Sequence, residues 1–240
     1  RPYAWKYRGY VIRAFNDDKP FDQFLVEQLA GDELFDYANA KEITPTIHDA
    51  LVATGFLRMA PDGTTANPVN RVEDRLEVIS DEVDILARGV MGLTMNCARC
   101  HDHKYDPITQ ADYYSLTAVF KGAYDEYDWM TPQKFNNQWE KMKQRHLAIA
   151  LPEEKHEWDA KMTVFNTELE KLNAQLAALD KSKSSEIKSL KKKINAFKAK
   201  PPTQPQIRAL WDRGRPSESY VYKRGDHLLT GDRVDPGVPV

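Results

Sequence analysis

A seven-residue repeat of apolar side chains constrains the fold of this chain more than any other feature of the sequence. Between Trp158 and Leu179, apolar residues follow one another at alternating steps of four and three, which is the spacing of a coiled-coil seam. The residues of this seam are Trp158, Met162, Phe165, Leu169, Leu172, Leu176 and Leu179. The polar stretch 180–185 interrupts the repeat, which then resumes at Ile187, Leu190, Ile194 and Phe197. This pattern predicts an antiparallel hairpin of two helices, and one long helix is the alternative.

Apolar residues also follow one another at helical spacing in most of the remaining chain. Apolar periodicity and capping residues predict helices at 3–15, 20–29, 46–56 and 71–91, and a further helix after the capping pair Thr109 and Asp112. In the first two helices we expect Phe15 and Phe21 to face inward. Short extended stretches at 207–211 and 220–222 predict strands, and residues 224–226 predict a plain turn. We therefore expect a mainly α fold with a short β or extended C-terminal tail.

These elements suggest three regions. We expect a helical core that carries the functional motif at residues 1–130, the coiled-coil hairpin at 131–202, and an extended segment at 203–240 that leads to a further domain. The chain opens directly in a predicted helix, so we expect it to be a piece of a longer polypeptide with any export signal upstream. The hairpin is a candidate for association with another coiled coil.

Composition and charge exclude several classes of function. No run of about 18 apolar residues is present, so the sequence predicts no membrane span. The formal net charge is −2, and the sequence lacks the basic stripe with base-reading partners that nucleic-acid binding requires. The lysine-rich stretch 188–193 alternates with apolar residues at helical spacing, which indicates a solvated helix face.

The motif that carries chemistry contains the only two cysteines of the chain. Cys97 and Cys100 lie three residues apart, and His101 follows directly, which is the pattern of c-type haem attachment. Two thiols one helical turn apart can form thioethers with two vinyl groups of a porphyrin, and the histidine is then placed as the proximal iron ligand. The sequence therefore predicts covalent haem c at Cys97, Cys100 and His101.

Three other interpretations of the cysteine pair remain open. The pair can be a redox-active dithiol, although such motifs usually accompany a βαβ pattern that this sequence lacks. It can bind zinc through Cys97, Cys100 and His103, with a fourth ligand from His48, His227 or a carboxylate. It can also be a purely structural pair of buried thiols, which leaves the adjacent histidine unexplained.

The sixth iron ligand is not fixed by the sequence. Met91, Met95, Met130, Met142 and His48 are chemically able to fill this position. Met91 and Met95 are expected first as core side chains, and His103 as a neighbour of the site and not an iron ligand. An iron without a protein ligand at this position is open to small molecules.

Several segments resemble a known family. Residues 1–8, 14–16, 28–32 and 53–56, together with the run 92–107 that contains the motif, are similar to the planctomycete cytochrome-associated family with a CxxCH domain (domain of unknown function 1549). The resemblance covers about residues 1–125 and resumes at 211–240, where 224–226 and 234–239 look like the junction with the following domain. It implies a large exported protein with further domains, and redox work linked to carbohydrate breakdown.

The function expected from the sequence is single-electron transfer by a haem domain of a larger exported, periplasmic protein, with a redox protein or further cytochrome domain as partner. One alternative is a metal- or haem-dependent enzyme, for example in carbohydrate breakdown, in which Asp102, His103 and Asp106 line an open site. Another is a coiled-coil interaction scaffold in which the cysteine pair is only structural.

Overall fold

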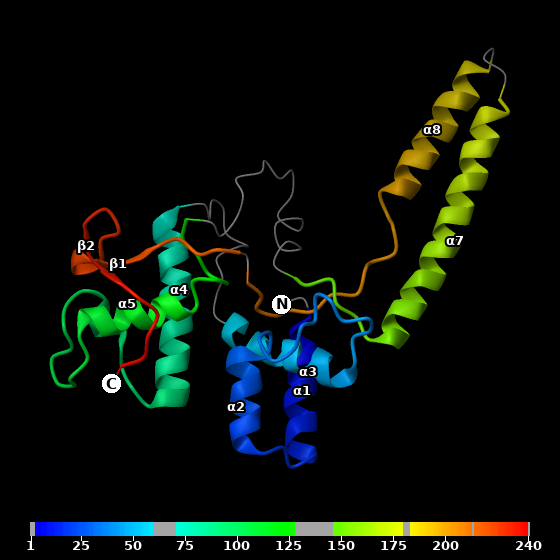
Figure 1. Ribbon diagram of the computed structural model, residues 1–240. Coiled ribbons are helices and arrows are strands. Elements are labelled where there is room, and N and C mark those ends of the chain that lie inside the picture. The colour runs from blue at the N-terminus through cyan, green and yellow to red at the C-terminus, as the bar shows by residue number, and fades with distance from the viewer. Residues whose placement is uncertain (1–2, 60–70, 128–145, 180–182, 213, 240) are drawn as a thin grey trace. The chain divides into compact units, whose positions relative to one another are not determined.

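The computed structural model describes residues 3–59, 71–127, 146–179, 183–212 and 214–239 (Figure 1). The fold is mainly α, as predicted. The chain forms two compact units: the first comprises Arg1–Asp36, Asp49–Leu147 and Arg208–Val240, and the second comprises Tyr37–His48 and Ala148–Ile207. The predicted motif belongs to the first unit and the predicted hairpin to the second. Among the described residues, no helix has the length and apolar character needed to cross a membrane.

The first four elements are α1 (Ala4–Asn16), α2 (Phe21–Ala30), α3 (Pro45–Ala53) and the 3-10 helix η1 (Thr54–Met59). The hydroxyl of Tyr10 donates to buried Glu27 at 2.7 Å, and that of Tyr7 donates to Gln28 at 2.6 Å. The contacts between α1 and α2 are therefore partly polar. The inward placement predicted for Phe15 and Phe21 is wrong: they are 74% and 71% exposed, because the tyrosines and their acceptors occupy this interface.

Gly31, directly after α2, allows its backbone to lie close to that of Ala50. A Cβ at Gly31 would lie 2.0 Å from the carbonyl oxygen of Ala50 and 2.3 Å from that of Glu27, so no larger residue fits there. The segment 28–32 owes its glycine to this backbone contact.

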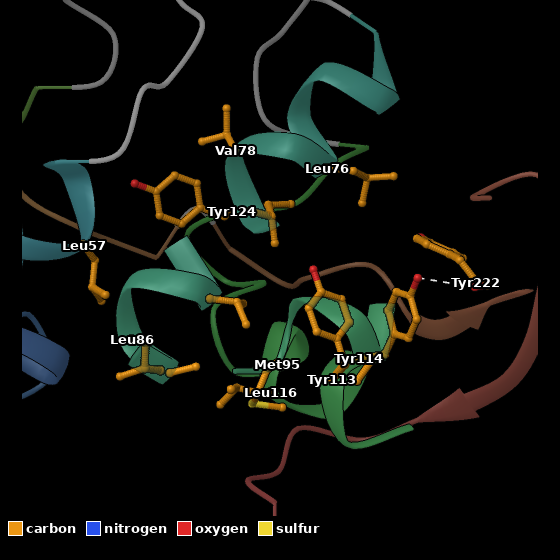
Figure 2. Packing of buried hydrophobic residues seen from close by; sticks show 14 of the residues in the cluster. Leu57, Leu76, Val78, Leu86, Met95, Tyr113, Tyr114, Leu116, Tyr124 and Tyr222 are labelled. Carbon is orange, nitrogen blue, oxygen red and sulfur yellow. Dashed lines mark hydrogen bonds between the residues drawn. The ribbon is translucent and has the colours of Figure 1, made fainter. Parts of the chain in front are cut away.

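The main hydrophobic core of the first unit lies around α4 (Val72–Leu86) and α5 (Gln110–Val119). Helix α4 continues as the π-helical turn η2 (Ala87–Met91), so the helix predicted at 71–91 is confirmed with a change of hydrogen bonding in its last turn. Helix α5 begins with the predicted capping box of Thr109 and Asp112. Figure 2 shows the core side chains, among them Leu76, Val78, Leu86, Met95 and Leu116.

The C-terminal part of the first unit contains a two-stranded antiparallel sheet. Strand β1 (Ser219–Tyr222) confirms the strand predicted at 220–222, and it pairs with β2 (Thr230–Val234), which the sequence pattern did not indicate. The turn between the strands includes the short 3-10 helix η4 (Lys223–Gly225), so the predicted turn at 224–226 is confirmed.

The strand predicted at 207–211 is not formed. Only a single bridge forms at Ile207, and Ala209 and Leu210 are buried with two of their backbone groups bonded to side chains. The Ala209 carbonyl accepts a hydrogen bond from Arg58 at 2.9 Å, and the Leu210 amide donates to Thr54 Oγ1 at 2.8 Å. The sequence pattern at 207–211 therefore indicates burial correctly, but the strand that it predicts is wrong.

A charged cluster is buried beside the sheet. Lys121 Nζ contacts Glu126 Oε1 at 2.9 Å, and the same carboxylate accepts the Tyr222 hydroxyl at 2.5 Å. Arg75 of α4 donates to the backbone carbonyl of Glu126 at 2.6 Å. The ion pair of Lys121 with Glu126 and the hydrogen bonds of Tyr222 and Arg75 to Glu126 thus join α4, the end of α5 and β1.

The second unit contains the helical hairpin. Helices α7 (Pro152–Ala177) and α8 (Ser184–Lys198) lie side by side, which confirms two helices in place of one long helix (Figure 1). The rings of Phe165 and Phe197 stack across the hairpin with centroids 4.6 Å apart. Leu172 and Ile194 are the most buried residues of the two helices, and both belong to the predicted seam.

Candidate functional site

The two cysteines lie on a short turn whose other face is part of the core. This turn is the 3-10 helix η3 (Asn96–Arg99). Met95 and Ala98, three residues apart, are fully buried, whereas Cys97 and Cys100, also three apart, are exposed. Residues three apart share a face of a 3-10 helix, so anchoring one pair in the core presents the other pair to solvent. Both cysteines are free thiols.

His101 extends the same exposed surface. Its Nδ1 lies 2.7 Å from the backbone carbonyl oxygen of Asp102. Because a carbonyl oxygen only accepts, this contact assigns the proton to Nδ1 and leaves the lone pair on Nε2. A histidine that binds a metal through Nε2 usually has its other ring nitrogen held in this way.

His103 has a different role in the loop after the motif. Its side chain is 8% exposed, and its Nδ1 accepts a hydrogen bond from the Asp106 amide at 3.0 Å. Nε2 lies 3.5 Å from the Thr94 hydroxyl, and the His103 amide donates to the Ile108 carbonyl at 2.8 Å. The imidazole thus holds the backbone of the loop that follows the motif.

Helix α5 fixes the motif through several hydrogen bonds. Asp102 Oδ1 accepts the Gln110 amide at 2.8 Å, which caps the first turn of the helix. Gln110 Nε2 also donates to the Arg99 carbonyl at 3.0 Å, and the Tyr114 hydroxyl donates to the same carbonyl at 3.0 Å. Arg99 pairs with Glu77 of α4 at 2.9 Å. The motif turn is therefore tied to both core helices.

The same two side chains of α5 join the motif to the C-terminal sheet. Gln110 Nε2 and the Tyr114 hydroxyl lie 2.9 and 3.3 Å from the Tyr222 carbonyl, to which both donate. The rings of Tyr114 and Tyr222 meet edge to face, with centroids 5.2 Å apart (Figure 2). This arrangement brings the turn that follows β1 to the cysteine pair.

Gly225 of this turn contacts the motif directly. It has a φ of +74°, and a Cβ at this position would lie 2.9 Å from Cys100 Sγ. The sequence predicted a turn here but gave no sign of its contact with the cysteine. Exposed apolar side chains follow on this turn and on the motif loop: Leu228 is 77% exposed and Tyr105 is 82% exposed.

The other methionines and histidines considered as iron or zinc ligands differ in their burial and in their contacts. Met95 is buried on the inward face of the turn, so the core role expected for it is confirmed. Met91 is partly buried against the same core. His227 Nε2 lies 3.9 Å from Glu73 Oε1 in the first turn of α4, and His48 is buried in α3. Met130 and Met142 lie outside the described residues.

The donor set of the motif can be compared with what a bound metal ion and a covalent haem each require. In the described ranges, no three His, Cys, Asp or Glu side chains are gathered as a metal site would require. Covalent haem needs fewer groups from the chain: two accessible thiols one turn apart, one imidazole with its lone pair on Nε2, and apolar surface nearby. Cys97, Cys100 and His101 provide the first two requirements, and Leu228 and Tyr105 provide exposed apolar surface on the adjoining segments.

Comparison with known proteins gives one match, to a family model. No curated protein and no solved structure matches the chain. The matching model is that of PSCyt2, described as a protein of unknown function (DUF1549), and the match extends over residues 1–125, which include α1, the motif and the whole of α5. Because the match covers more than half of the 240 residues, the chain belongs to the PSCyt2 (DUF1549) family.

Proposed function

We propose that this chain is the c-type haem-binding, electron-transfer domain of a larger exported redox protein. The observation that carries the proposal is the exposure of Cys97, Cys100 and His101 on one turn whose opposite face is buried. Free cysteine is among the most buried residue types, so two exposed thiols beside a correctly oriented imidazole favour a binding role over a structural one.

In this proposal the chain's own residues hold the haem. Cys97 and Cys100 would hold the porphyrin through two thioether bonds, each formed by addition of an S–H across a vinyl group, which needs no external oxidant. The Nε2 of His101 would bind the haem iron, and the Asp102 carbonyl holds the ring in the tautomer that leaves the Nε2 lone pair free. When bound, haem supplies one-electron redox chemistry.

The neighbouring polar residues support electron transfer more than catalysis. Asp102 accepts the first amide of α5, and His103 accepts an amide of its own loop. Both groups are therefore already engaged in holding the backbone, which disfavours their use as acid and base in an enzyme of carbohydrate breakdown. We propose that the electron partner is a separate redox protein or a further cytochrome domain, and that the protein acts in the periplasm, where haem is attached to exported chains.

The test is production of the chain in a bacterial periplasm together with a c-type haem maturation system. The expected product is coloured, and its haem stays with the polypeptide after denaturation in acidic organic solvent. Cys97→Ser with Cys100→Ser should abolish this retention, and His101→Gln should change the visible spectrum. His156→Gln, at an exposed histidine of α7, is the matched control and should alter neither. A colourless product that contains stoichiometric zinc or a disulfide would overturn the proposal.

A further inference from the structure

The helical hairpin of the second unit leaves much of its apolar seam uncovered. Leu172 and Ile194 are 3% and 4% exposed, whereas the other seam residues of α7 and α8 are only partly buried. Two helices can cover only one side of each other, so a seam of this length is buried fully only when another helical layer packs against it. The uncovered side is therefore a surface suited to further helices.

The two helices carry opposite charge. Helix α7 contains six carboxylates and three lysines, which gives a net charge of −3. Helix α8 contains five lysines and one glutamate, which gives a net charge of +4. All five lysines of α8 are exposed, and none forms an ion pair with another described residue; they are Lys188, Lys191, Lys192, Lys193 and Lys198.

Some of the acidic side chains of α7 also lack an ion-pair partner, whereas Glu157 pairs with Lys161 of the same helix at 2.6 Å. Asp159 and Glu170 are exposed and have no ion-pair partner among the residues that the structure describes. Glu168 pairs only with Lys171 of its own helix, at 3.8 Å. Each hairpin thus presents one acidic and one basic helix beside a partly open apolar seam.

We propose that the hairpin binds a second copy of this chain, with α7 of each copy facing α8 of the other. A twofold arrangement places every acidic helix against a basic one, so a single self-complementary surface is satisfied in both copies. Burial of the seam supplies the affinity, and the charges select the orientation and make the association sensitive to salt. The pairing joins two copies of the motif-bearing unit in one assembly and does not depend on haem.

The test uses reciprocal charge reversal in the full chain. One variant carries Lys191→Glu, Lys193→Glu and Lys198→Glu in α8, and the other carries Asp159→Lys, Glu168→Lys and Glu170→Lys in α7. Sedimentation velocity should show a dimer for the unchanged chain and a dissociation constant at least about tenfold higher for each variant alone. Because mixing pairs the reversed helices with opposite charge, an equimolar mixture should recover the dimer, with one copy of each variant by native mass spectrometry.

Two controls keep the test decisive. Circular dichroism must show unchanged helix content, and the milder set Lys191→Gln, Lys193→Gln and Lys198→Gln should weaken the dimer less than the glutamates do. An unchanged chain that remains monomeric well above micromolar concentration would overturn the proposal, as would variants that dimerise alone as tightly as the parent. Failure of the mixture to recover the dimer would also overturn it, and would direct attention to an acidic partner protein or to the first unit as the occupant of this surface.

Discussion

Gly225 lies against Cys100, so close that a Cβ at position 225 would be 2.9 Å from the cysteine Sγ. The two residues are far apart in the sequence. They meet because Gln110 Nε2 donates to the carbonyl oxygens of Arg99 and Tyr222, and the single proton of the Tyr114 hydroxyl is shared between the same two oxygens. The turn after β1 thus contacts the cysteine pair, although it lies outside residues 1–125, the part of the chain that matches the family model.

Gly225→Ala should destabilise the first unit and impair attachment at Cys100. The left-handed backbone alone costs an alanine about 1–2 kcal/mol, and the contact with the sulfur adds to this. Gly92→Ala is the matched control, because Gly92 has a φ of +68° but a Cβ there would have no atom within 4 Å. Urea unfolding and the rate of Cys100 alkylation measure the effect. Equal losses of stability in the two variants would show that the contact with Cys100 makes no contribution of its own.

The effects of Gln110→Ala and Tyr114→Phe on the free energy of unfolding should be coupled. Tyr114→Phe leaves each carbonyl with one N–H of Gln110, and Gln110→Ala leaves the two carbonyls to share the Tyr114 proton, so each change should cost about 1 kcal/mol. The double variant leaves both carbonyls without these donors and should cost more than the two single changes together. A double-mutant cycle by urea denaturation checks this, and simple additivity would contradict the shared role of the two side chains.

Local periodicity explains why much of the fold could be predicted. The helices 72–86 and 152–177 follow from apolar residues at steps of three and four, and the start of α5 follows from the capping pair Thr109 and Asp112. The motif itself was also evident, because Cys97, Cys100 and His101 are neighbours in the sequence. These predictions depend only on residues that are close along the chain.

The missed features depend on contacts between distant segments. Strand β2 has the sequence Thr-Gly-Asp-Arg-Val, which lacks the alternation of a half-buried strand and is formed by pairing with β1. The burial of Lys121 and Glu126 could not be foreseen, because charged residues are rarely buried unless paired and the pairing involves the fold around Tyr222. Gly225 looked like an ordinary turn residue because its contact with Cys100 is tertiary.

Lys121→Met should strongly destabilise the first unit. The change leaves the buried Glu126 carboxylate without its cation, and breaking such a pair typically costs about 3–5 kcal/mol. Lys161→Met, which breaks the exposed pair of Lys161 with Glu157, should cost less than about 1 kcal/mol. Thermal or urea unfolding of both variants measures the difference. Similar small effects would contradict the structural role of the buried pair.

Asp32 should make stability depend on pH. Burial, with a smaller contribution from the nearby carboxylate of Glu33, raises the pKa of Asp32 from 3.8 to about 6. The folded state therefore binds the proton more tightly than the unfolded state, and the stabilisation from protonation is lost as pH rises from about 4 to about 6. Asp32→Asn should remove this dependence of the free energy of unfolding on pH. It should also stabilise the protein at pH 7 by about 1–2 kcal/mol, after allowance for the partial exposure of Asp32. A variant with an unchanged slope would contradict this assignment.

We propose that two thioethers and one imidazole hold haem on the turn at 97–101. The most direct measurement is the intact mass of the protein purified from an oxidising compartment, recorded together with its visible spectrum. We expect a mass increased by one haem that is retained after denaturation, together with the absorption bands of a c-type cytochrome. A colourless protein with the mass of the bare polypeptide, with a Cys97–Cys100 disulfide or with bound zinc would contradict it.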